Sequence, residues 1–146
     1  MSVVRQGGPE LRGAPLPERV LVRVLPSVPR SAEVARAATR VACRSWSVPQ
    51  SCDTAALVTT ELVGNSVRHA RTRDLTLRLS MTPRRLRIEV QDADPTLPRT
   101  PRRELLGEGH RGLWIVSQLA VRWGVEPSVD GKTVWVELPL PGDDAC

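Results

Sequence analysis

The chain has 146 residues, which is the length of one ordinary domain and too short for two full-sized cores. Hydrophobic residues make up 40% of the sequence and charged residues 25%, so the chain is expected to fold without disulfides or a structural metal. No apolar run reaches the roughly 20 residues of a membrane helix, and the N-terminal sequence lacks a signal-peptide core. The three cysteines are scattered and have no metal-ligand spacing, which favours a reduced, cytoplasmic protein.

The net charge of +5 comes from 20 arginines and one lysine against 16 acidic residues. A basic chain suggests nucleic-acid binding, but the basic residues are dispersed and no block of five or six like charges occurs. The sequence has no Phe or Tyr on which bases could stack. The arginine excess is also what a GC-rich genome produces. Direct nucleic-acid binding is therefore the least favoured function.

The N-terminal half of the chain predicts a tail, a strand and two helices. Residues 1–17 are rich in Gly and Pro and predict a flexible tail. Val20–Leu25 is a β-rich run ended by Pro26. A first helix is expected over Ser31–Trp46 with Ser31 as its N-cap, and a second over residues 53–70 with Asp53 as its cap. The apolar positions at helical spacing are Val34, Ala38, Val41 and Ala42 in the first helix and Ala56, Leu57, Leu62 and Val63 in the second.

The C-terminal half predicts a hairpin, a long loop, a third helix and two more strands. Leu75–Leu79 and Leu86–Val90 alternate strictly, as in an antiparallel hairpin with one wet face. Residues 93–111 are rich in Pro and Gly, and a loop of this length is usually functional. The helix Gly112–Ala120 and the strands 121–126 and 132–138 follow, as does a C-terminal tail. This order predicts an α/β fold, a two-layer sandwich whose mixed, mostly antiparallel sheet carries the helices on one face.

Three polar side chains, Glu61, Asn65 and His69, follow one another at spacings of four on the predicted second helix. Each step turns by about 40° around a helix, so the three lie on one face. A carboxylate, an amide and an imidazole in a row suggest a site, although they could also form a solvated face. His69 by itself is more often a structural histidine at a helix end.

Two further features lie where predicted elements end. Asp92 follows an alternating strand at the rim of the sheet, where the long loop begins. That loop ends in Gly-Glu-Gly-His-Arg-Gly over 107–112, directly before a helix. Glycine-rich backbone at a helix N-terminus binds anions, because free N–H groups and the helix dipole point at the ligand. In this order after Glu61 and Asn65, the two features predict an anion-binding site.

Together these motifs resemble the ATPase/kinase superfamily shared by gyrase, heat-shock chaperones, histidine kinases and mismatch-repair ATPases. Residues 61–70, Glu-Leu-Val-Gly-Asn-Ser-Val-Arg-His-Ala, look like its N-box. Val90–Pro95 is similar to its first glycine box, Gly107–Leu113 to its second and Asp130–Pro139 to its closing strand. The best match is the small, single-domain branch of anti-sigma regulatory factors with serine kinase activity. The resemblance implies a Bergerat-type ATP-binding fold over residues 18–140, followed by a tail at 141–146.

The resemblance also implies roles for individual residues. Asn65 matches the residue that holds Mg²⁺, and Glu61 matches the general base that deprotonates a serine hydroxyl. Asp92 matches the carboxylate that accepts a hydrogen bond from the adenine amino group, and Thr133 matches a residue that bonds near the adenine. The second box would face the phosphates of ATP. Its matched residues are Gly109, Arg111, Gly112 and Leu113.

The function implied is an ATP- and Mg²⁺-binding serine/threonine protein kinase that phosphorylates an antagonist protein and regulates transcription through a sigma factor. The sigma factor and the antagonist are the expected partners, a homodimer is a further option, and no membrane contact is expected. The first glycine box reads Asp92-Ala93-Asp94-Pro95 and lacks both of the glycines that the family pattern has there. In the second glycine box, Glu108 and His110 differ from the family pattern. A non-catalytic ATP-binding module that regulates protein partners therefore stays open as the alternative.

Overall fold

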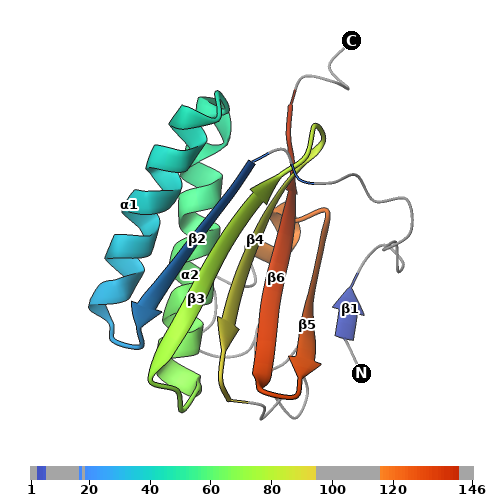
Figure 1. Cartoon of the computed structure of the whole chain (residues 1–146). Coiled ribbons are helices and arrows are strands. Elements are labelled where there is room, and N and C mark those ends of the chain that lie inside the picture. Colours follow the sequence, from blue (N-terminus) through green and yellow to red (C-terminus); the bar gives the residue numbers. More distant parts are fainter. Residues whose placement is uncertain (1–2, 6–16, 18, 95–115, 142–146) are drawn as a thin grey trace.

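The computed structural model describes residues 3–5, 17, 19–94 and 116–141. Six strands form one sheet in the order β1-β5-β6-β4-β3-β2, and all neighbouring pairs are antiparallel. Helices α1 (Arg30–Ser45) and α2 (Cys52–His69) lie on one face of the sheet, with a short 3-10 helix at Pro49–Ser51 between them (Figure 1). The strands are β1 (Val3–Arg5), β2 (Arg19–Pro26), β3 (Asp74–Met81), β4 (Arg85–Asp92), β5 (Arg122–Ser128) and β6 (Gly131–Pro139).

This architecture confirms the predicted α/β sandwich, with two differences. The described strand pairs are all antiparallel, so the described sheet is not mixed. Residues 1–17 were expected to form a tail, but Val3–Arg5 form β1 and pair with β5, where they cover an otherwise open strand edge. Of the predicted third helix, residues 116–119 are described and helical. Among the described residues, no helix combines the length and apolar character needed to cross a membrane.

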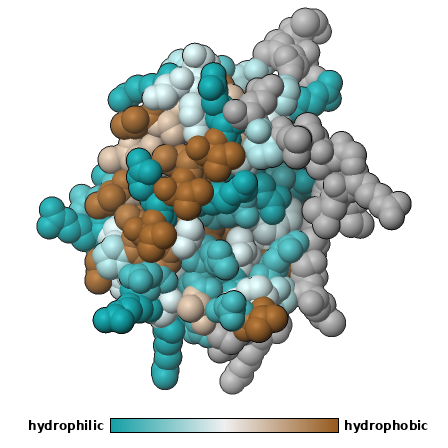
Figure 2. Space-filling view, in the orientation of Figure 1, coloured by the Kyte–Doolittle hydropathy of each residue, from teal (hydrophilic) through white to brown (hydrophobic). Residues whose placement is uncertain are grey.

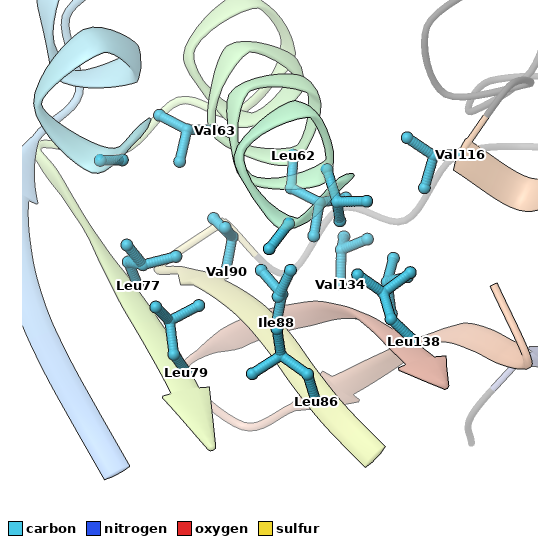
Figure 3. Close-up of a cluster of buried hydrophobic side chains, with 14 of the residues drawn as sticks. Leu62, Val63, Leu77, Leu79, Leu86, Ile88, Val90, Val116, Val134 and Leu138 are labelled. Atoms are coloured by element: carbon cyan, nitrogen blue, oxygen red, sulfur yellow. The ribbon is translucent and has the colours of Figure 1, made fainter. Parts of the chain in front are cut away.

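The alternating leucines of the predicted hairpin form the centre of the core. Leu77 and Leu79 of β3 are fully buried, and they pair with Val90 and Ile88 of β4. Figure 3 shows these side chains lying beneath α2, with Leu62 above them. Burial of each such side chain contributes about 1.5–3 kcal/mol. The same packing fixes the distance of α2 from the ends of β4 and β6.

Helix α1 presents a different face to the core from the one its valines suggest. Ala35 and Thr39 are fully buried, and the Thr39 hydroxyl lies 2.9 Å from that of Thr59 on α2. Val34 and Val41, in contrast, are 47% and 60% exposed. The predicted Ser31 N-cap is also wrong: Pro29 occupies that position, and the Ser31 hydroxyl donates to the carbonyl of residue 26 instead. Small residues on the buried stripe let the two helices approach closely.

Strand β2 is an edge strand with an apolar outer face. Val20, Val22 and Val24 are 47%, 47% and 66% exposed and point away from the helices. Figure 2 shows apolar side chains gathered over this side of the molecule. Neighbouring β3 places Arg78 opposite Val22. The helix-free face of the sheet therefore changes from apolar at β2 to charged towards its centre.

The centre of that helix-free face is a charged network around Trp135 of β6. The guanidinium of Arg87 lies 4.2 Å from the Trp135 ring centroid, and that of Arg122 lies 5.6 Å from it. Both arginines bond the Glu137 carboxylate, at 2.8 and 2.7 Å. Arg87 and Arg78 also pair with Glu89. Among the described residues, stacking and ion pairing thus stabilise this face of the sheet.

Cys43 on α1 is buried, and its burial raises the pKa of the thiol to about 11, from an ordinary value of 9.0. A shift of this size leaves roughly 100-fold less thiolate at pH 8 than in the unfolded chain. Native Cys43 should therefore resist iodoacetamide at pH 8 and react in denaturant, as read by mass spectrometry. Because the folded state holds the proton more tightly, its stabilising contribution is complete below pH 9 and is lost between pH 9 and 11. Cys43→Ala should remove that part of the pH dependence.

Candidate functional site

The end of α2 and the ends of β4 and β6 enclose a small cavity of about 20 Å³. One face of α2 contributes residues at helical spacing, and the sheet contributes the side chains that point towards the helices. The lining residues are Leu62, Asn65, Ser66, His69, Ala70, Val90, Asp92, Lys132 and Val134. Its apolar floor is continuous with the core in Figure 3, where Leu62, Val90 and Val134 are labelled. The predicted site residues Asn65 and Asp92 are thereby brought together.

Asp92 is the best-connected polar group of the cavity and is 4% exposed. Its Oδ1 accepts the backbone N–H of Asp94 at 2.9 Å, the turn that aspartate side chains often form with the residue two positions on. Its Oδ2 accepts the Ser66 hydroxyl at 3.3 Å. The Lys132 ammonium lies 3.2 Å from Oδ1. The carboxylate is therefore held in one orientation, as a site that reads a ligand by hydrogen bonding requires.

Asp94 stands where the family pattern has a glycine, and its contacts explain how the turn forms without one. The Asp94 carboxylate accepts the backbone N–H of Arg71 at 2.8 Å. The backbone N–H of Ala93, the residue before Asp94, donates to the Thr72 hydroxyl at 3.2 Å. These bonds join the end of β4 to the connection between α2 and β3. The altered first box thus keeps Asp92 at the end of α2.

The side-chain oxygen of Asn65 is buried and has no hydrogen-bond partner among the residues that the structure describes. A buried acceptor without a donor is costly, which suggests that a ligand supplies the missing contact. An amide oxygen is a ligand for Mg²⁺, a hard cation that binds few protein groups and keeps several waters. Among the described residues no group of three His, Cys, Asp or Glu gathers to hold a metal. The buried amide oxygen of Asn65 is chemically suited to the Mg²⁺ position that the resemblance implies for it.

The remaining predicted residues lie around or away from the cavity. Glu61 is half-buried one helical turn before Asn65, and His69 is an exposed part of the lining. Thr133 pairs with Gln91 and so faces the helix-free side of the sheet, away from Asp92. The contact of Thr133 with adenine stays a prediction, and the pairing register of β4 with β6 does not favour it. Four predicted residues lie outside the described residues: Gly109, Arg111, Gly112 and Leu113.

Two residues of the site were missed by the sequence analysis. Ser66 directly follows Asn65, and its spacing of four from Leu62 places it on the core-facing side of α2. Lys132 pairs with Asp92 across β4 and β6. The signal for Lys132 was its uniqueness, since it is the one lysine among 21 basic residues. Its place opposite Asp92 depends on a pairing register that the sequence alone does not reveal.

Gly131 begins β6 where the strand passes the end of β4. A Cβ at this position would lie 1.8 Å from the carbonyl oxygen of Asp92 and 2.8 Å from the Cα of Ala93. Its φ of +157° is one that side-chain-bearing residues rarely adopt. Only glycine lets β6 approach Asp92 closely enough for the next residue to contact the carboxylate.

Comparison with protein families agrees with this geometry. Residues 25–138 match the model of the histidine kinase-like ATPase domain, a range that runs from the end of β2 through both helices and strands β3, β4 and β5 to β6. The chain belongs to this family. The histidine kinase-like ATPase domain is an ATP-binding domain, so the cavity beside Asp92 and Asn65 lies in a domain built to bind ATP. No curated protein matches the chain.

Proposed function

We propose that this ATPase-domain protein is an anti-sigma-type serine/threonine protein kinase that uses ATP and Mg²⁺. The observation that carries the proposal is the buried Asn65 oxygen, which has no partner in the described part of the chain. It lies in the same cavity as Asp92 and one helical turn from Glu61. Asn65 would hold Mg²⁺, which neutralises phosphate charge, and Asp92 would accept from the adenine amino group. Glu61 would then lie on the phosphate side of the metal ligand.

Glu61 supplies the general base in this proposal. Its carboxylate takes the proton of a serine hydroxyl on the antagonist protein while the serine oxygen bonds to the γ-phosphorus of ATP. The bond from that phosphorus to the bridging oxygen breaks, and ADP leaves. Such catalysis depends mostly on positioning and on charge neutralisation. The new negative charge on the antagonist would weaken its complex with the kinase and free the kinase to bind a sigma factor.

Glu61→Gln tests the catalytic part of the proposal. We expect phosphoryl transfer from labelled ATP to the antagonist to fall by roughly 100-fold or more, because a general base typically contributes 10²–10⁴-fold. The affinity for ATP, measured by calorimetry, should stay unchanged. Glu33→Gln on the exposed face of α1 is the matched control and should leave both unchanged.

The same experiment separates the kinase from a non-catalytic ATP-binding module. The changed first box, in which Asp94 replaces a glycine, favours this second candidate. If the wild-type chain binds ATP and Mg²⁺ but transfers no label to the antagonist, the module is correct and the kinase is wrong. A homodimer is proposed for either function, and the exposed valines of β2 offer an apolar surface for it.

A further inference from the structure

The one lysine of the chain has its ammonium inside the ATP-site cavity. Lys132 Nζ lies 3.2 Å from Asp92 Oδ1 and donates to the carbonyl oxygen of Asp94 at 3.0 Å. The side chains of Lys132 and Asp92 are 12% and 2% exposed. Val90 and Val134 flank this pair in the cavity lining. A cation and a carboxylate are thus paired with little water around them, where their attraction is stronger than at a surface.

Among the described residues, the space left beside Asp92 and Lys132 is small. Its volume of about 20 Å³ is enough for one water molecule, whereas ligand pockets usually measure several hundred Å³. The backbones of β4 and β6 are paired through this region, with Asp92 opposite Lys132. The flexible lysine side chain is therefore the part of this wall that can move most easily.

The lysine ammonium and the amino group of adenine offer the same chemistry to Asp92. Both are N–H donors, and the carboxylate accepts either. Asp92 already accepts from Asp94 and from Ser66, so the bond to Lys132 is its third. A carboxylate has about four acceptor positions, two on each oxygen. The Asp94 N–H and the Lys132 ammonium share Oδ1, so one of the two donors at that oxygen is the mobile lysine.

We propose that Lys132 competes with adenine for Asp92, so that the base must displace the lysine ammonium from the cavity before it can bind. The inference rests on the proposed role of Asp92 in binding adenine. In the ligand-free protein Lys132 neutralises the carboxylate and closes the cavity. Its displacement costs the Lys132–Asp92 ion pair, and this cost lowers the affinity of the site for every adenine compound. Lys132 thereby sets the affinity of the site.

The test is calorimetric titration of adenosine and of ADP into the wild-type chain and three variants. Lys132→Met removes the ammonium at nearly constant length, Lys132→Gln keeps a neutral donor, and Lys132→Arg keeps the positive charge. Adenosine is the decisive probe, because it carries no charge that the loss of a lysine would weaken. We expect roughly tenfold tighter adenosine binding in the Met and Gln variants, the size of one charge-assisted hydrogen bond, and little change with Arg. Circular dichroism melts check folding, and the Gln variant decides if the Met variant does not fold.

The outcomes separate this inference from the proposed function. Equal or weaker adenosine binding by the Met and Gln variants overturns the competition, while adenine binding by the wild-type chain keeps the proposed function. If neither the wild-type chain nor any variant binds adenosine or ADP, the proposed function is wrong and the competition is wrong with it. Binding by the Met and Gln variants alone supports both.

A second readout uses the fact that the chain has one lysine. Protein grown with ¹⁵N-lysine has a single side-chain ammonium to observe by NMR. In the ligand-free protein its two bonds should slow proton exchange with water, so the ammonium signal should be visible. Saturating adenosine should abolish the signal by moving the ammonium into water. A signal that persists unchanged at saturation would contradict displacement.

Discussion

Replacing Asp92 by asparagine should lower the affinity for ATP by roughly 10- to 100-fold, the cost of losing one hydrogen bond to a charged group. The asparagine keeps one acceptor oxygen, which the Asp94 N–H and the Lys132 ammonium occupy, and so its N–H₂ group is left for the adenine amino group. Two donors cannot bond each other. Selectivity for ATP over GTP should collapse as well, because guanine has a carbonyl where adenine has the amino group. Calorimetric titration of ATP and GTP with Mg²⁺ measures both effects.

The same variant should also be less stable. Without the Asp92 charge, the Lys132 ammonium is left 12% exposed and without its counter-charge. A polar group in that state costs about 1–3 kcal/mol, which a thermal melt would detect. Asp74→Asn, at the exposed start of β3, is the matched control and should change neither affinity nor stability. Undiminished ATP affinity and selectivity in the Asp92 variant would refute the role of Asp92 as the adenine acceptor.

Gly131→Ala should damage the fold and the site together. The added methyl group would overlap the carbonyl of Asp92, and neither strand can yield without losing its pairing. Overpacking and backbone strain of this kind cost about 2–4 kcal/mol, which corresponds to a fall of roughly 10 °C in the melting temperature. ATP affinity should fall too, because the carboxylate of Asp92 is displaced. Melting curves and calorimetry check the two effects.

Gly64→Ala provides the contrast for Gly131→Ala. Gly64 lies within α2, and a Cβ there would meet only the end of the flexible Arg68 side chain, at 3.3 Å. Alanine is favoured over glycine inside a helix by about 1 kcal/mol. The Gly64 variant should therefore be as stable as the wild-type chain or slightly more stable. Equal effects of the two substitutions would show that the close approach at Gly131 has no special importance.

The central strands could be predicted from the sequence because their side chains obey one rule. Leu75, Leu77 and Leu79 alternate with polar residues, so a single choice of face assigns every one of them, and all three are buried. Helix α1 allows two overlapping apolar stripes. The valine stripe is the more hydrophobic, but the stripe with Ala35 and Thr39 is the one that is buried. Its small side chains let α1 pack closely against α2.

The site residues also differ in how far the sequence could predict them. Asn65 and Asp92 could be assigned from motifs, since each lies in its own short, recognisable segment. Lys132 is 40 positions from Asp92, and only the pairing register of β4 with β6 places it opposite the carboxylate. A shift of one residue would have placed Thr133 opposite Asp92 instead. The alternation of β6 puts Lys132 on the same face of the sheet as Asp92, but no short motif shows that the two strands pair at these residues.

The network around Trp135 also changes what the excess of arginine means. On the helix-free face of the sheet, Arg78, Arg87 and Arg122 are paired with two glutamates, so that this face has little charge to project. Helix α1 carries four arginines and one glutamate, and lies at the opposite side of the sheet layer. Among the described residues, α1 therefore keeps an excess of positive charge, even with Arg40 paired to Asp53. This excess attracts acidic molecules towards α1, and added salt weakens the attraction.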